Sequence, residues 1–411
     1  MPLLRGFMAV AIAAAAVSAA AGDWPQILGP DRTGLAAADE RLADRWPEAG
    51  PPVRWRREVG AGYAGLAIVG DRAILFHRRG DREVVEALDA ATGRTAWTAE
   101  DATTFRPQVG GGDGPLCVPL VHDGHVFTFG AQGTLACRDL GTGDTIWSRR
   151  THREFAAVEG YFGAGSTPLV VGDLVVVNVG GRDDAGIVAF DRRTGKTAWQ
   201  RTTEAASYSS PVAVVVGERP HVLAVTRSAC MLLDAGGGEV RWQFPFGKRG
   251  PTVNAATPLA LPGGRLFVTA SYGVGCVCAE FDAAAARPLW QGEEPLATQY
   301  CTPLAIDGHL YGIDGRDDGP PADLVCADLK TGRVLWRERG FGYGTLLAAD
   351  GRLLAAKTGG ELVLLQATPA GVETRGRCRP LPGTLRALPA LSRGRLYLRD
   401  DTTLICLDLA P

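Results

Sequence analysis

The sequence has almost no excess charge and none of the common catalytic motifs. Its 411 residues carry 43 Lys and Arg against 45 Asp and Glu, and a net charge of −2 gives no long-range attraction to nucleic acid or to an anionic membrane. There is no Gly-x-Ser-x-Gly nucleophile elbow, no phosphate-binding loop and no zinc-ligand spacing. These absences exclude a nucleic-acid-binding role and favour a binding protein over an enzyme, although an active site can also be assembled from single residues that are far apart in the sequence.

Cysteine is present but lacks the spacings that bind metal or haem. The nine cysteines include no Cys-x-x-Cys and no Cys-x-x-Cys-His, and their odd number leaves at least one thiol without an intramolecular partner. Cys137, Cys326 and Cys406 stand in the same register of a repeat described below. Because equivalent positions of different repeat units point inward, we expect these three to be buried small hydrophobes. The sequence does not define a disulfide pairing.

Long apolar runs are absent except at the N-terminus. Residues 1–21 combine one Arg, an apolar run and small residues suited to cleavage, and this pattern predicts a secretory signal peptide that is too short to be a stable membrane anchor. No Cys follows the expected cleavage region, so neither a lipid anchor nor a transmembrane segment is expected. Residues 22–52 are predicted to form an irregular arm, with one short helical turn over 36–45. The mature protein is expected to be exported to the periplasm or cell envelope of a bacterium.

One ten-residue pattern recurs along the chain. An Asp is followed by a Trp eight positions later six times, at Asp89/Trp97, Asp139/Trp147, Asp191/Trp199, Asp234/Trp242, Asp282/Trp290 and Asp328/Trp336. Four copies read Asp-x-x-Thr-Gly-x-x-x-Trp. Asp accepts hydrogen bonds from backbone N–H groups of a turn, and Gly adopts the positive φ that other residues resist. Each copy therefore predicts a hairpin whose second strand carries a large, buried Trp.

A second series of turns has the same period. Eight two-residue turns split apolar runs, at 70–71, 123–124, 172–173, 217–218, 263–264, 307–308, 350–351 and 393–394. Each unit thus holds two hairpins, or four strands, within 43–53 residues, which is the size of a β-propeller blade. Gly and Pro, 54 and 26 residues, make up about a fifth of the chain and suit such a turn-rich all-β protein.

The incomplete copies predict how the ring closes. The seventh unit has Ala367 and Arg375 in place of Asp and Trp, and the eighth reaches Asp408 without an outer strand. The segment from Val53 to Val59 carries Trp55 without a preceding hairpin, so we expect it to complete the last blade and remove open sheet edges. Residues 53–411 should form one eight-bladed propeller of four-stranded antiparallel blades, with seven blades as the alternative.

The repeat resembles a known family. Asp-x-x-Thr-Gly-x-x-x-Trp, together with strand starts such as "STPLVV", "SSPVAV" and "CTPLAI", is similar to the propeller repeat of the pyrroloquinoline quinone (PQQ) type. The segment "WPQILGPDRTG" at 24–34 resembles the lead-in of exported bacterial PQQ-like propellers. The resemblance covers essentially the whole mature chain and is specific for fold, because the repeated residues are structural.

Relatives of this repeat fall into two classes. Quinoprotein dehydrogenases bind PQQ with Ca²⁺ in the central funnel and often place adjacent cysteines against it; this chain has no Cys-Cys pair and no haem site, although Glu159, Asn178 and Asn254 are conceivable Ca²⁺ ligands. The outer-membrane assembly lipoprotein of Gram-negative bacteria is similar in repeat and size and acts as a scaffold for partner proteins. This chain departs from it by lacking the lipid-anchor Cys.

Propeller geometry places a binding site on one face. The loops between blades and the middle loop of each blade are long and variable here, and binding residues concentrate on such loops over a rigid scaffold. The candidate residues for ligand or partner binding on this face are Arg182, Asp184, Lys248, Arg249, Asn254, Tyr272, Tyr300, Arg316 and Asp318. His152 and Arg153 could add to a basic rim.

The sequence therefore predicts an exported, non-catalytic propeller that binds an envelope protein or peptide and is a monomer, with no cofactor. Two alternatives remain: a PQQ-dependent oxidoreductase that uses PQQ and Ca²⁺, and a propeller that binds a small ligand or glycan. Fold alone cannot decide among them, because function depends on the site that a scaffold carries.

Overall fold

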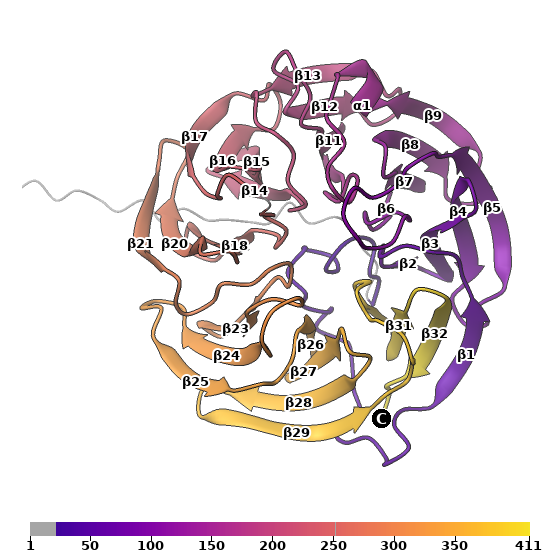
Figure 1. Cartoon of the computed structure of the whole chain (residues 1–411), viewed down its shortest axis with the longest axis vertical. Coiled ribbons are helices and arrows are strands. Elements are labelled where there is room, and N and C mark those ends of the chain that lie inside the picture. Colours follow the sequence, from indigo (N-terminus) through magenta and orange to yellow (C-terminus); the bar gives the residue numbers. More distant parts are fainter. Residues whose placement is uncertain (1–21, 251) are drawn as a thin grey trace, which may run out of the picture.

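Eight four-stranded antiparallel sheets are arranged around a central axis (Figure 1). The computed structural model describes residues 22–250 and 252–411. The predicted eight-bladed propeller is confirmed, and the seven-blade alternative is wrong. The predicted signal peptide, residues 1–21, lies outside the described residues.

The first four blades use strands in chain order from the axis outward. They are β2 (Ala67–Val69), β3 (Arg72–Arg79), β4 (Arg82–Asp89) and β5 (Thr95–Ala102); β6 (Leu120–His122), β7 (His125–Phe129), β8 (Thr134–Asp139) and β9 (Thr145–Arg150); β10 (Leu169–Val171), β11 (Leu174–Asn178), β12 (Ile187–Asp191) and β13 (Thr197–Arg201); and β14 (Val212–Val216), β15 (Arg219–Val225), β16 (Ala229–Asp234) and β17 (Val240–Pro245). The one helix among the described residues is the four-residue α1 (Thr151–Glu154).

The remaining blades follow the same plan except for the last. They are β18 (Leu259–Leu261), β19 (Arg265–Ala270), β20 (Gly275–Phe281) and β21 (Ala286–Gly292); β22 (Leu304–Ile306), β23 (His309–Asp314), β24 (Asp323–Asp328) and β25 (Val334–Glu338); β26 (Gly344–Ala349), β27 (Arg352–Lys357), β28 (Leu362–Thr368) and β29 (Gly371–Cys378); and β30 (Ala390–Ser392), β31 (Arg395–Arg399) and β32 (Thr403–Asp408), completed by β1 (Val53–Glu58).

Closure occurs where the sequence predicted it. Strand β1 pairs antiparallel with β32, with Trp55 opposite Cys406 and Glu58 opposite Thr403. The N-terminal strand thereby becomes the outer edge of the eighth blade, which would otherwise have three strands and an open edge.

The outer hairpins have the predicted chemistry. In the first blade the Asp89 carboxylate accepts hydrogen bonds from the Thr92 backbone N–H (2.8 Å) and the Thr92 hydroxyl (2.7 Å). Gly93 follows with φ +70, and a Cβ at this position would lie 2.7 Å from the Trp55 ring. The glycine is therefore required both by its backbone conformation and by the approach of a tryptophan from the neighbouring blade.

Each outer-strand tryptophan contacts the next blade rather than only its own. The indole N–H donates to a backbone carbonyl at the following outer hairpin, an arrangement that we call the Trp clasp. The seven clasps are Trp55 to Ala90, Trp97 to Leu140, Trp147 to Arg192, Trp199 to Ala235, Trp242 to Asp282, Trp290 to Leu329 and Trp336 to Thr368. The junction of the seventh and eighth blades has Arg375 at the tryptophan position and has no clasp among the described residues.

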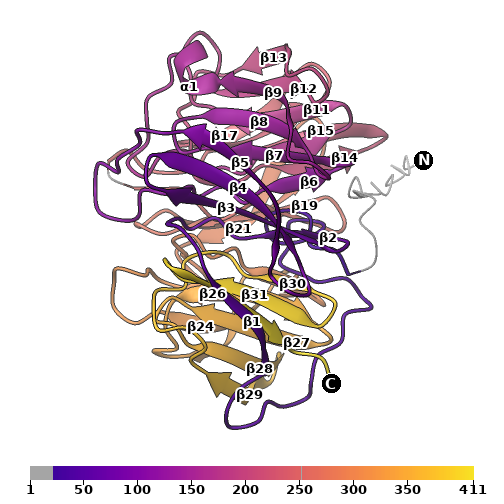
Figure 2. The same cartoon turned by 90° about the vertical axis from the view of Figure 1, so that its right-hand side faces the viewer.

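The N-terminal arm, residues 22–52, covers that junction. Trp46 is 8% exposed, and its ring lies against Gly376 on β29. The Glu40 carboxylate accepts the Arg393 N–H (3.0 Å) in the turn of the eighth blade. Over residues 22–52 the arm contains no helix or regular strand before β1. In place of the helical turn expected over 36–45 there is a single turn closed by the Glu40 N–H and the Ala37 carbonyl (3.0 Å), and the rest of the segment is held by contacts with the sheets. In Figure 2 the arm runs along one face of the ring before it turns into β1.

The arm also enters the ring near its axis. Arg32 is 2% exposed, and its guanidinium donates to Gln26 Oε1 (2.8 Å) and to the carbonyls of Pro211 (2.6 Å) and Pro168. Both prolines precede inner strands, so one buried cation bridges the third and fourth blades. Burial lowers the pKa of Arg32 to about 9.

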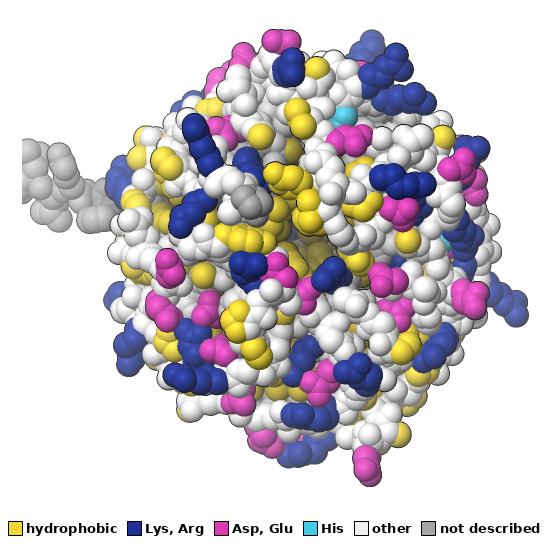
Figure 3. All heavy atoms as spheres, in the orientation of Figure 1, with side chains coloured by type: hydrophobic (Ala, Val, Ile, Leu, Met, Phe, Trp, Pro, Cys, Tyr) yellow, Lys and Arg dark blue, Asp and Glu magenta, His cyan; other side chains and the backbone are white. Residues whose placement is uncertain are grey.

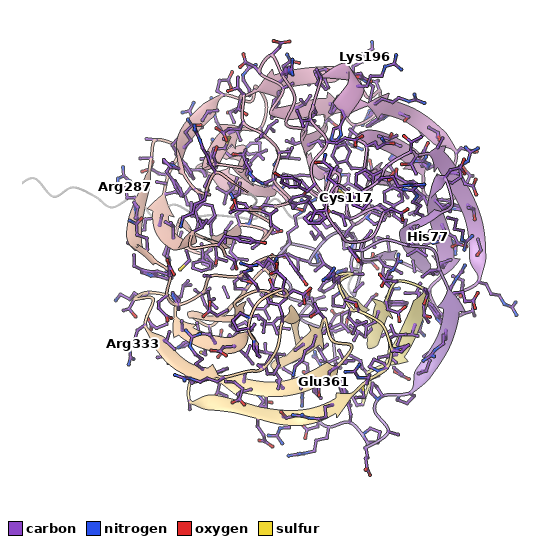
Figure 4. All side chains as sticks on the ribbon, viewed as in Figure 1. His77, Cys117, Lys196, Arg287, Arg333 and Glu361 are labelled. Atoms are coloured by element: carbon purple, nitrogen blue, oxygen red, sulfur yellow. The ribbon has the colours of Figure 1, made fainter. Side chains whose placement is uncertain are left out.

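The cysteines are structural. All nine are unpaired, and eight of them are buried, including Cys137, Cys326 and Cys406, as predicted. Cys117 lies near the centre of the ring in Figure 4, whereas Lys196, Arg287 and Arg333 lie at its periphery. Burial raises the pKa of the Cys117 thiol, so it packs as a neutral side chain.

Candidate functional site

The two faces of the ring differ in loop structure. The inner and outer turns of every blade lie on one face, which we call the turn face, and the blade connections and middle loops lie on the other, which we call the loop face. The arm contacts the turn face, since Asp23 accepts from Gly70 (3.0 Å) and Leu42 donates to Asp350 (3.2 Å) in the inner turns. The loop face has a central hollow lined with hydrophobic side chains (Figure 3).

All nine candidate residues lie on the loop face. Arg182 and Asp184 are between β11 and β12; Lys248, Arg249 and Asn254 between β17 and β18; Tyr272 between β19 and β20; Tyr300 between β21 and β22; and Arg316 and Asp318 between β23 and β24. The structure brings three of them together, and the Lys248 ammonium group approaches Gly273 beside this cluster.

Tyr272, Arg316 and Asp318 form one cluster. The Arg316 guanidinium carbon lies 4.6 Å from the centre of the Tyr272 ring, and its Nε and Nη2 each donate to Asp318 at 2.8 Å. These hydrogen bonds lower the pKa of Asp318 below its usual value. Because Asp318 already occupies the bidentate face of Arg316, this arginine is paired within its own loop rather than presented to a carboxylate or phosphate ligand.

Asn254 and Tyr300 hold loops in place. The Asn254 side-chain nitrogen donates to the carbonyls of Thr226 (2.9 Å), Arg227 (3.2 Å) and Phe246 (3.1 Å), and the residue is 3% exposed. The Tyr300 ring packs edge-on against Tyr343 with centroids 4.7 Å apart, and burial raises the pKa of its hydroxyl. The Asn254 amide nitrogen thus anchors loops and is not free for a ligand, and the Tyr300 ring packs within the fold while its hydroxyl is buried without a hydrogen-bond partner among the described residues.

Four candidates remain exposed. No hydrogen bond or ion pair within residues 22–250 and 252–411 engages the side chains of Arg182, Asp184, Lys248 and Arg249. They lie in two different blade regions and do not converge on one point of the loop face. A basic rim at His152 is not supported either, because burial lowers the pKa of this imidazole to about 4 and keeps it neutral at pH 7.

A cavity that the sequence did not predict lies beside these loops. It has a volume of about 350 Å³ and is lined by residues of the second to fourth blades and their connections, among them His152, Val158, Glu159, Tyr161, Asn178, Tyr208 and Arg227. Glu159 and Asn178, two of the conceivable Ca²⁺ ligands in the sequence, and His152, a candidate for the basic rim, all line this cavity. Their convergence depends on how the 155–165 loop folds over the third blade, which no local pattern specifies.

Close packing at glycines shapes this loop. A Cβ at Gly160 would lie 2.9 Å from the Tyr208 hydroxyl, and a Cβ at Gly165 would overlap the Tyr208 ring. The Phe162 N–H donates to that hydroxyl (3.1 Å). The run "GYFGAG" therefore matches the aromatic side chain of the next connection, and this pairing is the signal that could have identified the cavity.

The residues present do not assemble the donor set of a Ca²⁺ site. Glu159 and Asn178 line the same cavity, but the Asn254 amide is bonded to backbone carbonyls. Across the described ranges no group of three His, Cys, Asp or Glu side chains could hold a metal ion. Ca²⁺ prefers six to eight oxygen ligands, including carboxylates. Cys276 and Cys278 are buried on β20 and are not adjacent.

Comparison with known proteins identifies relatives among outer membrane assembly factors and among quinohemoprotein dehydrogenases. A family model described as "Outer membrane protein assembly factor BamB" matches residues 81–338. Outer membrane protein assembly factor BamB of Burkholderia pseudomallei is 27% identical over 298 residues, which are 69% of this chain and 68% of that protein. Quinohemoprotein alcohol dehydrogenase ADH-IIG of Pseudomonas putida is 27% identical over 277 residues, 59% of this chain but 36% of the enzyme.

Solved structures share the fold at lower identity. BamB from Moraxella catarrhalis superimposes with a TM-score of 0.64 and 17% identity, over 87% of this chain and 99% of the other. Quinohemoprotein alcohol dehydrogenase from Comamonas testosteroni gives a TM-score of 0.68 and 14% identity, over 96% of this chain and 82% of the other. These similarities extend to the fold alone.

Proposed function

Because the chain belongs to the family of outer membrane protein assembly factor BamB, we propose that it is an exported, non-catalytic scaffold that binds another protein or peptide of the cell envelope. The partner docks on the loop face, while the arm covers the turn face. No helix among the described residues is long and apolar enough to cross a membrane.

The distribution of exposed hydrophobic side chains carries this proposal. Of the large hydrophobic residues exposed in the described chain, three lie on two neighbouring loops of the loop face: Val109 (56% exposed), Val158 (78%) and Tyr161 (38%). The others, Val53, Ile146, Val240 and Leu289, are spread singly over the outer strands β1, β9, β17 and β21. Clustered exposed apolar residues mark interaction sites, whereas single ones are ordinary.

The two loops form one unit. The Gln108 N–H donates to the Tyr161 carbonyl (2.9 Å), so the 103–116 and 155–164 loops are joined by a backbone hydrogen bond. The side chain of Gln132 connects both: its amide oxygen accepts the Thr104 N–H (2.9 Å), and its amide nitrogen donates to Glu159 (2.8 Å). A surface held in this way can present Val109 and Val158 to a partner without first being ordered.

Site-specific photo-crosslinking in the native host tests the proposal. A photoreactive residue at Val109 or Val158 should capture a discrete envelope protein, and one at Val240 or Leu289, equally apolar and exposed on outer strands, should not. Equal labelling at all four positions, or labelling at none, would contradict a scaffold that docks through the loop face.

A second measurement addresses the oxidoreductase alternative. The purified protein is titrated with PQQ and Ca²⁺ while absorbance and melting temperature are followed. We expect no saturable change. Stoichiometric binding with a raised melting temperature would contradict the non-catalytic assignment.

A further inference from the structure

The 350 Å³ cavity carries two opposite charges that have no ionic partner. Glu159 lines it from the 155–165 loop, and Arg227 lines it from the middle loop of the fourth blade. Within the described residues neither side chain takes part in an ion pair, although an approach of 4 Å between them would form one. The two charges therefore stand apart on the cavity wall and do not neutralise one another.

Both charged side chains keep hydrogen-bonding atoms that are not used within the protein. The Glu159 charge partly offsets the lowering of the His152 pKa by burial, and the Arg227 charge partly offsets the raising of the Tyr208 pKa by burial. Glu159 accepts one hydrogen bond from Gln132 through Oε1, which leaves Oε2 available. One Arg227 nitrogen, Nη2, donates to the Gly250 carbonyl, which leaves the rest of the guanidinium available.

A buried acceptor adds to the recognition chemistry. Asn178 lines the cavity and is 4% exposed; its amide nitrogen donates to Ser207 (3.3 Å), while its Oδ1 has no hydrogen-bond partner. His152 Nδ1 is likewise buried without a partner. Buried polar atoms are almost always hydrogen-bonded in folded proteins, so an orphan acceptor on a cavity wall indicates a site for a donor.

Apart from Gln108 and Ser207, the remaining wall consists of small apolar residues and two tyrosine rings. Val158, Val179, Ala164 and Ala206 line the cavity with the Tyr161 and Tyr208 rings. The volume is at the low end of the range of ligand sites, which corresponds to a small molecule rather than to a nucleotide or a quinone cofactor.

We propose that this cavity binds a small zwitterion with an apolar body: a free α-amino acid, or a short peptide such as a dipeptide whose two termini carry the two charges. The ammonium group binds Glu159 and the Asn178 amide oxygen, the carboxylate binds Arg227, and the apolar side chain packs against the valine and alanine wall. The site shares Val158 and Tyr161 with the proposed docking surface. Ligand binding is measured in the absence of a partner protein, so this inference does not depend on the proposed scaffold function.

Three probes of nearly equal shape test the contributions of the ammonium group and the carboxylate to binding one at a time. L-leucine carries both charges, 4-methylpentanoate lacks the ammonium group, and isopentylamine lacks the carboxylate. In calorimetric titration of the full chain at pH 7, L-leucine should bind, and each single-charge analogue should bind at least about tenfold more weakly. Leucylglycine distinguishes the source: tighter binding than that of L-leucine assigns the site to peptide ends, and weaker binding assigns it to free amino acids.

Matched variants test the residues. Glu159→Gln keeps an oxygen for Gln132 but removes the charge, and Arg227→Gln removes the cation; each should weaken L-leucine binding at least about tenfold. Glu280→Gln and Arg241→Gln, which remove exposed charges on β20 and β17, should leave it unchanged. Ala206→Trp should abolish binding by filling the cavity, whereas Ala284→Trp in an outer turn should not.

The outcomes are decisive in either direction. Failure of both L-leucine and leucylglycine to bind, or equal affinity for 4-methylpentanoate or isopentylamine, overturns the proposal, as does unchanged binding in Glu159→Gln and Arg227→Gln. Circular dichroism and melting temperature of each variant separate loss of the site from loss of the fold. None of these results alters the photo-crosslinking expectation.

Discussion

The indole nitrogen of Trp55 donates a hydrogen bond to the carbonyl oxygen of Ala90 at 3.1 Å, and this contact joins the last blade to the first. Trp55 lies on the closing strand, and Ala90 follows the Asp of the first outer hairpin. The Trp55 ring also packs against the Tyr397 ring, with the two centroids 5.9 Å apart. Closure of the ring thus depends on a side chain as well as on the β1–β32 ladder.

We predict that Trp55→Ala lowers the free energy of unfolding by about 3 kcal/mol, because it removes a large packed ring and a hydrogen bond. Val53→Ala on the same strand, where the side chain is 49% exposed, should change it by less than about 0.5 kcal/mol. Urea unfolding followed by circular dichroism measures both. Similar midpoints for the two variants would mean that the clasp does not stabilise the closure.

Two glycines with similar backbone angles should respond differently to alanine. Gly93 and Gly80 have φ +70 and +60, but a Cβ at Gly93 would meet the Trp55 ring at 2.7 Å, and one at Gly80 would meet open space. Both substitutions incur about 1 kcal/mol of backbone strain, and Gly93→Ala adds about 1–3 kcal/mol of overpacking. Thermal denaturation compares them, and equal melting temperatures would refute the steric role of Gly93.

Stability should fall as pH rises through neutrality because of Glu83. This carboxyl is 3% exposed and accepts the Ala131 N–H (2.7 Å) of the second blade; burial raises its pKa from 4.5 to about 7. With the folded-state pKa above the unfolded value, its contribution is complete below about pH 4.5 and is lost as the pH passes 7, by about 3 kcal/mol at most.

The variant Glu83→Gln should remove this pH dependence. Unfolding free energies at pH 5 and pH 8 would then differ less in Glu83→Gln than in the unaltered protein, while Glu100→Gln, an exposed residue on β5, should behave like the unaltered protein. An identical pH profile in Glu83→Gln would show that the buried carboxyl is not the titrating group.

The junction of the seventh and eighth blades should depend on the arm. Trp46→Ala should raise amide hydrogen exchange in β29 and β30 before that in β10 to β13, because it uncovers the one blade junction that has no Trp clasp among the described residues. Hydrogen-exchange mass spectrometry resolves these segments. A uniform rise in all blades would indicate global destabilisation instead.

The blade count and closure were predictable because they depend on local signals of fixed period. The Asp, Thr and Gly of the four complete outer hairpins act within five residues, and the missing outer strand after Asp408 has its counterpart at Trp55. The role of the tryptophans was only half predicted. Burial follows from the residue type, whereas donation to the next blade requires the arrangement of blades around the axis.

The candidate site was less predictable, because most of its contacts join residues from different blades. Arg316 and Asp318 are two residues apart, and their pairing is local, but the stacking of Arg316 on Tyr272 crosses two blades. Asn254 resembles a ligand in the sequence and is a loop anchor in the structure. Glu159 and Arg227 are 68 positions apart and share one cavity only because the intervening strands return to the same face.

The closing strand has a consequence for how the protein is made. Glu58 of β1 pairs with Thr403 of β32, so the first strand to be synthesised has its hydrogen-bonding edge unmatched until nearly the whole propeller has followed it. Such non-local pairing is slow to form and leaves an edge that can join another chain. The eighth blade therefore cannot be completed until β32, the last strand of the described chain, has been synthesised.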